Sequence, residues 1–102
     1  MVDRLVPNRT DYVIAEENAR QFNANLLCVE GGHNKYYIMQ VLRKNHRPGS
    51  TPYRFYRRWG RCGTDGQYMS KDYATVEEAI ADFNAILEDK MEEYSEVHVT
   101  YP

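Results

Sequence analysis

The stretch from Tyr53 to Gln67, YRFYRRWGRCGTDGQ, contains the densest group of aromatic, arginine and glycine residues in the chain. It also holds the single tryptophan, Trp59. An arginine can pair with phosphate oxygens while a neighbouring ring stacks on a sugar or a base, so this mixture is typical of nucleic-acid contact. The alternative is that Trp59, Tyr53 and Phe55 belong to the core with arginine stems lying over them, and composition alone modestly favours that alternative.

An extended conformation would divide the first half of this stretch between two faces, because side chains alternate along a strand. One face would carry Tyr53, Phe55, Arg57 and Trp59, and the other Arg54, Tyr56 and Arg58. Neither face is purely apolar, whereas an ordinary half-buried strand has one apolar face. We therefore expect this strand both to fill a core and to present a contact surface.

Charge is segregated along the chain, although the net charge is only −2. Seven of the thirteen Lys and Arg residues lie between Arg43 and Arg61, a segment without Asp or Glu. From Asp72 to Glu96, nine acidic residues accompany a single lysine, Lys90. The acid-free segment suits phosphate, and the acidic segment suits basic partners or plain solvation.

The sequence contains no recognisable catalytic constellation. Nucleophile-elbow and zinc-protease motifs are absent, and Gly60, Gly63 and Gly66 fall in a turn between strands rather than in a phosphate loop before a helix. Cys28 and Cys62 lack the spacing of a zinc site, and the three histidines are scattered. We expect no catalysis by this chain alone, no metal, no cofactor and two reduced cysteines.

The length of 102 residues suits one domain with a single core. Residues 1–10 are polar and are expected to form a flexible lead-in, followed by a single domain over residues 11–102. No apolar run approaches the roughly 18 residues of a membrane span, and residues 1–10 lack the apolar centre of a signal peptide. We therefore expect an intracellular protein without membrane contact.

The elements that must position these residues form an antiparallel meander. The expected strands are Leu26–Glu30, Asn34–Arg43, the strand beginning at Tyr53, and Gln67–Tyr73, with tight turns at Gly31-Gly32 and Asp65-Gly66. Asn34–Arg43 is apolar on both faces and is expected in the centre of the sheet. Residues 11–25 are expected to be irregular with at most a short strand, and Ser95–Tyr101 to form a last strand or an ordered tail.

A single helix is predicted after Thr75. Thr75 as N-cap and Glu78 three residues later form a capping box. Apolar residues then recur at helical spacing, at Val76, Ala79, Ile80, Phe83, Ile86 and Leu87. This stripe must pack on the sheet, so the expected fold class is α+β: a small antiparallel sheet with one helix packed on it.

The tripeptide Trp59-Gly60-Arg61, preceded by YRFYRR and followed by CGTDGQ, resembles the hallmark of the WGR domain, a module known from DNA-dependent poly(ADP-ribose) polymerases. NKYYIMQVL at residues 34–42 is similar to the family's first long strand, and AIADF at residues 79–83 to the helical segment behind it. The resemblance covers about residues 25–90. It implies the fold described above, a nuclear protein, and a module that senses DNA ends or nicks and relays that state to adjacent regulatory and catalytic domains.

By position, the resemblance implies that Trp59 stacks on the sugar of the terminal nucleotide, and that Arg61 supports this contact and communicates with adjacent domains. It also implies that Asn34, Lys35 and Arg58 lie near the terminal phosphate. Charge alone adds four electrostatic candidates, Arg43, Arg47, Arg54 and Arg57. Residues 28–33 are expected to lengthen a loop beside the phosphate site.

Two functions remain open at this point. The first is a DNA-binding regulatory module that recognises strand breaks with 5′-phosphorylated ends, without sequence readout, within a poly(ADP-ribose) polymerase. The second is a protein-interaction or scaffolding domain without end sensing, because arginine and tyrosine enrichment suits a protein interface equally well. The absence of acids around Trp59 favours the first.

Overall fold

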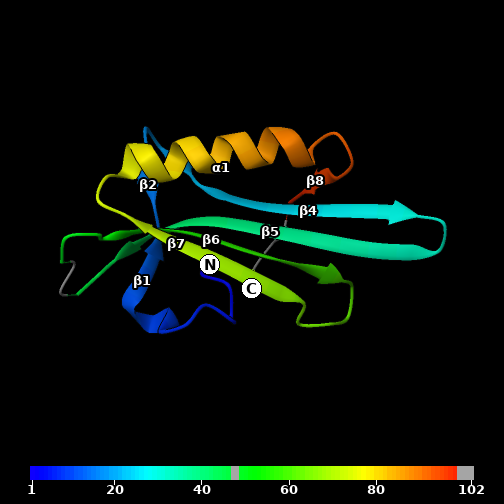
Figure 1. Cartoon of the computed structure of the whole chain (residues 1–102), viewed down its shortest axis with the longest axis horizontal. Helices are drawn as coiled ribbons and strands as arrows, with labels where there is room; N and C mark the ends of the chain where they lie inside the picture. Colours follow the sequence, from blue (N-terminus) through cyan, green and yellow to red (C-terminus); the bar gives the residue numbers. More distant parts are fainter. Residues whose placement is uncertain (47–48, 99–102) are drawn as a thin grey trace.

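The computed structural model describes residues 1–46 and 49–98. Its strands are β1 Tyr12–Ile14, β2 Glu16–Glu17, β3 Arg20–Gln21, β4 Asn23–Glu30, β5 His33–Lys44, β6 Tyr53–Arg61, β7 Gln67–Tyr73 and β8 Ser95–Val97; its helices are the 3-10 turn Arg9–Asp11 and α1 Val76–Lys90. The main sheet is six-stranded with the order β7-β6-β5-β4-β8, and β1 pairs with β5 beside this path. Helix α1 lies along one face of the sheet (Figure 1). The predicted α+β fold, a small antiparallel sheet with one helix, is confirmed.

The meander from β4 to β7 follows the expected chain order, with β5 in the centre. The expected lengthened loop over residues 28–33 is wrong, because β4 continues to Glu30 and β5 begins at His33. Gly31 and Gly32 make the tight turn between them with φ of 56° and 80°, a conformation that glycine adopts without strain. The last strand is confirmed over Ser95–Val97, where it pairs with β4. Residues 99–101 of the predicted segment lie outside the described residues.

Residues 11–25 are more regular than expected. They contain β1, the β2–β3 hairpin and the start of β4. Apart from the β2–β3 pair, their partners lie far away in sequence: the Ala15 N–H donates to the Val41 carbonyl at 2.8 Å, and the Val41 N–H donates to the Phe22 carbonyl at 2.9 Å. Pairing with the central strand therefore imposes an order that the local sequence does not specify.

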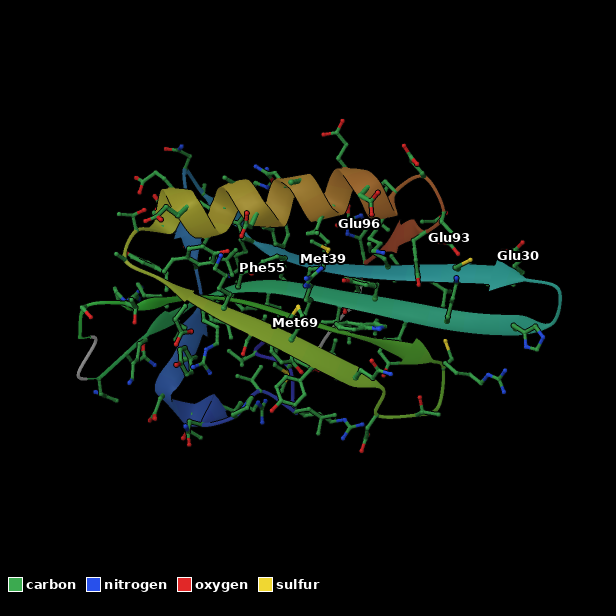
Figure 2. All side chains as sticks on the ribbon, viewed as in Figure 1. Glu30, Met39, Phe55, Met69, Glu93 and Glu96 are labelled. Carbon is green, nitrogen blue, oxygen red and sulfur yellow. The ribbon has the colours of Figure 1, made fainter. Side chains whose placement is uncertain are left out.

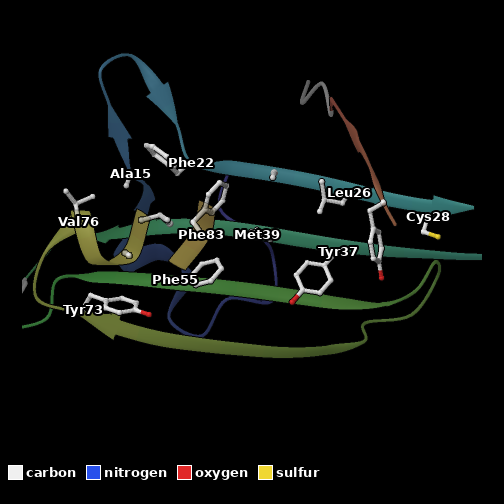
Figure 3. Close-up of a cluster of buried hydrophobic side chains, with 14 residues drawn as sticks. Ala15, Phe22, Leu26, Cys28, Tyr37, Met39, Phe55, Tyr73, Val76 and Phe83 are labelled. Carbon is white, nitrogen blue, oxygen red and sulfur yellow. The ribbon is translucent and has the colours of Figure 1, made fainter. Parts of the chain in front are cut away.

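Helix α1 begins where the capping box predicts. The Thr75 hydroxyl accepts the backbone N–H of Glu78 at 3.3 Å, and the predicted apolar stripe faces the sheet. Phe83 lies edge-on to Phe22 and Phe55, with ring centroids 5.6 and 6.0 Å apart, at the centre of the core (Figure 3). Within the described residues, no helix is long and apolar enough to span a membrane.

The second face of the sheet is covered by the N-terminal segment, which lies on the side away from α1 (Figure 1). Val6 is 4% exposed and packs in a second apolar cluster with Tyr12, Leu42 and Tyr56. Val6 and Asp3 thus attach residues 1–10 to the sheet, where their polar composition predicted a flexible lead-in. Both faces of β6 are consequently covered as far as Arg58, and burial falls from Trp59 to Arg61.

Candidate nucleic-acid interface

Beyond the end of α1, the register of the sheet gathers residues that are far apart in sequence. Lys35 on β5 is paired with Arg61 on β6, and Tyr37 is paired with Trp59. Paired residues share a face of the sheet, so all four side chains lie on the α1 side. The Lys90 ammonium, at the helix C-terminus, lies 5.1 Å from the Tyr37 ring centroid. The helix therefore stops over Tyr37 and leaves the strand ends open.

This open end forms a pocket of about 340 Å³ lined by His33, Asn34, Lys35, Trp59, Gly60, Arg61 and Tyr94. Trp59 is half-buried, and its ring is stacked on that of Tyr37 with centroids 5.6 Å apart and an interplanar angle of 13°. The two interpretations of Trp59 are therefore compatible: it packs against the core cluster and it also forms a wall of the pocket.

Arg61 is exposed at the rim of the pocket, and its Nη2 lies 3.3 Å from Nδ1 of His33. Asn34 is also exposed, and its carbonyl accepts the N–H of Cys62 at 2.9 Å. A second pocket of about 380 Å³, lined by Gly32, His33, Asn34, Arg61 and Cys62, adjoins the first. The two hairpin ends thus form one continuous hollow region around Arg61 and Asn34.

Lys35 has an acidic neighbour that the sequence does not reveal. Its ammonium pairs with the carboxylate of Glu93, in the segment after α1, and it lies 5.4 Å from the centroid of the Tyr94 ring. The hydrogen bond to Glu93 raises the pKa of Lys35. His33, Glu93 and Tyr94 are therefore site residues that sequence reasoning missed, because strand register and the α1–β8 connection bring them there.

Arg58 and Arg54 lie on the other face of β6, and each is already paired. The Arg58 side chain is 8% exposed and forms an ion pair with Asp3, and the hydrogen bonds that Arg58 donates to the Asp3 carboxylate raise the pKa of Arg58. Arg54 forms two hydrogen bonds with Asp72, of 2.7 and 3.2 Å, and lies over the Tyr12 ring. Neither guanidinium reaches the pocket lined by Trp59.

The described members of the remaining arginine candidates, Arg57 and Arg43, do not line the pocket. Arg57 faces α1 and donates to the Tyr37 hydroxyl at 3.1 Å, with its guanidinium 5.9 Å from the Trp59 ring. Arg43 is exposed at the opposite end of β5 from Lys35, and Arg47 lies outside the described residues. The acid-free segment of the sequence therefore does not form a single basic surface.

One cluster of possible metal ligands lies beside the pocket. Atoms of Cys28, Glu30 and Glu93 lie within 4.8 Å of one another, and Figure 2 shows both glutamates beyond the end of α1. The Lys35 ammonium already pairs with Glu93 in this cluster, and a positive charge at that position opposes a second cation. We assign no metal to it. Both cysteines are free, with Cys28 buried and Cys62 exposed.

The fold and the pocket together define a small α+β module in which the strand end Trp59-Gly60-Arg61 meets the neighbouring hairpin. The WGR domain model matches residues 20–99, and the chain belongs to this family. The resemblance stated from the sequence is confirmed.

Two curated relatives match the chain. It is 27% identical over 99 residues to "Poly [ADP-ribose] polymerase 2" of Arabidopsis thaliana, which covers 92% of this chain and 15% of that protein. It is 32% identical over 66 residues to the human "Protein mono-ADP-ribosyltransferase PARP3", which covers 65% of this chain and 12% of that protein. The chain thus corresponds to a small part of the length of either relative.

Proposed function

We propose that this WGR domain is a DNA-binding regulatory module that recognises strand breaks, preferably with 5′-phosphorylated ends, without reading sequence. The observation that supports this most directly is the pocket in which the half-buried ring of Trp59 lies beside the cations Lys35 and Arg61. An aromatic wall suits the sugar or base of a terminal nucleotide, and the flanking cations suit its phosphate.

The distribution of charge on α1 supports an approach of DNA through the hairpin ends and not through the helix. The apolar stripe of α1 is packed on the sheet, and its exposed side carries Glu77, Glu88 and Asp89. Reading bases in the major groove requires a helix or ribbon that can enter it beside the phosphates. An acidic, packed helix does not meet that requirement, which agrees with recognition without sequence readout.

The second part of the proposal is a relay to an ADP-ribosyltransferase in the parent protein. Both relatives are named as enzymes that transfer ADP-ribose, and this chain matches a small fraction of each. The natural partners are then adjacent regulatory and catalytic domains, and the natural compartment is the nucleus, in the response to DNA damage. The exposed guanidinium of Arg61 is available to contact such a neighbour at the rim of the pocket.

The test is binding to three DNAs over a salt series: nicked circles with a 5′ phosphate, nicked circles without it, and intact circles. We expect the tightest binding to the phosphorylated nick. Trp59→Ala should weaken that binding roughly tenfold or more, because stacking on an aromatic ring contributes about 1–3 kcal/mol per base. Tyr68→Ala is the matched control, since Tyr68 is 55% exposed but stacks on Tyr56, on the other face of the sheet.

Because Trp59 also packs on Tyr37, the variant Trp59→Phe is measured beside Trp59→Ala, together with the thermal stability of both. Equal affinity for all three DNAs removes the end-sensing proposal. Binding of Trp59→Ala as tight as that of the parent removes the role of the ring.

A second candidate function, a protein-interaction or scaffolding domain without end sensing, has one observation in its favour. A largely apolar groove of about 200 Å³ runs between α1 and β7, lined by Phe55, Arg57, Met69, Ser70, Lys71, Tyr73, Asp82, Ala85 and Ile86. Met69 is 52% exposed beside it (Figure 2). Nuclease-resistant binding to neighbouring domains of the parent protein, with no DNA binding at physiological salt, would favour this candidate over the first.

A further inference from the structure

The face of the sheet away from α1 contains a buried polar network that the proposed function does not use. Gln40 and Arg58 are 1% and 6% exposed, and they are the buried polar or charged residues of the part of the chain that the structure describes. A buried guanidinium needs a carboxylate and further acceptors to offset the loss of water. The N-terminal segment supplies partners to both side chains.

Asp3 supplies the carboxylate. It accepts Nε and Nη2 of Arg58 at 2.7 and 2.9 Å, and the hydroxyl of Tyr56 at 2.7 Å. Its backbone N–H donates to Oε1 of Gln40 at 2.9 Å, and Nε2 of Gln40 donates to the carbonyl of Met1 at 2.9 Å. Burial acts to raise the pKa of Asp3, but hydrogen bonds from Arg58 and Tyr56 outweigh it and lower the pKa below its ordinary value. Asp3 is therefore an ionised anchor for residues 1–6.

Arg58 reaches the turn between β6 and β7 with its remaining amino group. Nη1 donates to the carbonyl of Asp65 at 3.0 Å and to the hydroxyl of Tyr36 at 2.8 Å. Tyr36 donates in turn to the carbonyl of Thr64 at 2.8 Å. One guanidinium thus bonds the N-terminal segment on one side and the turn on the other. An exposed ion pair of 2.7 Å between Arg4 and Asp65 also joins the N-terminal segment to the turn.

The turn lies directly against the backbone of the strand end that forms the pocket. A Cβ on Gly60 would lie 2.8 Å from the Cα of Gly66, and a Cβ on Gly66 would collide with the carbonyl of Trp59. Packing as close as this transmits displacement between the two backbones, because close-packed atoms have low compressibility. The position of Trp59 and Arg61 therefore depends on the turn, and the turn depends on Arg58.

We propose that Arg58 is a positioning residue, which couples the docking of residues 1–6 to the shape of the Trp59 pocket through the turn at residues 62–66. Withdrawal of the segment leaves Arg58 without its carboxylate, so the guanidinium turns toward water and releases Asp65 and Tyr36. The turn then loosens and the pocket loses affinity for its ligand. The coupling itself needs no DNA; its effect on affinity rests on the proposed DNA binding.

The coupling is tested in the free protein by amide hydrogen exchange of Asp3→Asn. The Val6 N–H, bonded to the Asp3 carbonyl, reports docking, and the Thr64 N–H, bonded to the Arg61 carbonyl, reports the turn. The Ala15 N–H, bonded to Val41, is the reference within the sheet. We expect exchange to rise roughly tenfold at Val6 and Thr64 and to stay unchanged at Ala15.

Glu17→Gln is the matched control for this experiment, because it also removes one negative charge and Glu17 makes no side-chain hydrogen bond or ion pair with the rest of residues 1–46 and 49–98. This variant should leave the hydrogen-exchange rates of all three amides unchanged. Faster exchange at Val6 with an unchanged Thr64 overturns the proposal. An equal rise at all three amides also overturns it, since that result indicates only a less stable protein.

The variant Arg58→Lys distinguishes the docking of residues 1–6 from the effect of that docking on the turn at residues 62–66. A lysine keeps the charge opposite Asp3, but its single ammonium lacks the planar fork that bonds the carboxylate and the turn together. We expect Val6 to remain protected and Thr64 to exchange quickly. A protected Thr64 in Arg58→Lys would show that the guanidinium is not the link, and would overturn the proposal.

The effect on affinity is measured with nicked, 5′-phosphorylated DNA. Asp3→Asn should bind roughly fivefold more weakly than the parent, and Glu17→Gln should bind as the parent does. If the parent does not bind this DNA, the proposed function fails while the exchange data still decide the coupling. If the parent binds and Asp3→Asn binds equally despite a loosened turn, the coupling to the pocket is overturned.

Discussion

The two faces of β6 use the same residue type in opposite ways. Arg58, on the face away from α1, has an 8% exposed side chain, and it donates to Asp3, Tyr36 and the carbonyl of Asp65. Arg61, at the end of the same strand, is exposed, and within the described residues no carboxylate pairs with it. The two side chains carry the same charge, and they differ in burial and in partners.

This difference shows why a run of basic residues in a sequence is not yet a basic surface. Alternation along the strand sends successive arginines to opposite faces. Carboxylates from distant positions then reach the arginines of one face: Asp3 pairs with Arg58, and Asp72 pairs with Arg54. Arg61, at the strand end, lies beyond the reach of these two carboxylates and stays exposed at the rim of the pocket.

The first prediction tests the comparison through stability, where the largest effect is expected. Arg58→Met leaves the Asp3 carboxylate without its partner in a buried site and should lower the free energy of unfolding by about 3 kcal/mol. Arg61→Met removes the same charge from an exposed site and should change it by less than about 0.5 kcal/mol. Urea denaturation of both variants measures the two values. Equal losses would mean that the two arginines do not differ as described.

The fold was largely predictable because its signals are local. Alternation in Asn34–Arg43, the Gly31-Gly32 turn and the Thr75 cap each depend on a few neighbouring residues. The tight turn expected at Asp65-Gly66 is wrong, because residues 62–66 separate β6 from β7 and the Thr64 N–H bonds to the Arg61 carbonyl before that pair. The order of residues 11–25 and the packing of residues 1–10 were not predictable in this way. Their contacts join positions far apart in the chain, as the bond between Tyr56 and Asp3 illustrates.

The candidate site was predictable to the extent that two strand motifs contain it, one at residues 59–61 and one at residues 34–42. Trp59, Arg61, Asn34 and Lys35 were predicted, and the structure brings all four to the same pocket. His33, Glu93 and Tyr94 could not be found, because only the register of β5 and the path after α1 bring them there. The network around Arg58 was also hidden, since nothing in the sequence near Asp3 indicates an anchoring residue.

The second prediction sharpens the comparison by asking whether position, and not charge alone, decides DNA affinity. Lys35→Gln removes a cation from the pocket and should weaken binding to a 5′-phosphorylated nick roughly tenfold, with the salt slope falling by about one. Arg43→Gln removes the same charge at the far end of β5 and should have a much smaller effect on both. Fluorescence titrations over a salt series measure both the affinity and the salt slope of each variant. Equal effects would indicate a diffuse electrostatic contact instead of a pocket.

The third prediction concerns the anion already present at the pocket, and its expected effect is the smallest. Glu93 pairs with the exposed ammonium of Lys35 and competes there with a phosphate. Glu93→Gln should therefore tighten binding to the phosphorylated nick roughly threefold, since exposed ion pairs are weak, and should return the pKa of Lys35 toward its ordinary value.

The matched control is Glu96→Gln, because Glu96 is an exposed carboxylate on β8 for which the described structure shows no ion pair. Both variants remove one negative charge, so a difference between them isolates the contact with Lys35. If the two variants bind equally tightly, the effect of Glu93 comes from its negative charge alone and not from its contact with Lys35. Lys35 is then as available to a phosphate as Arg61 is.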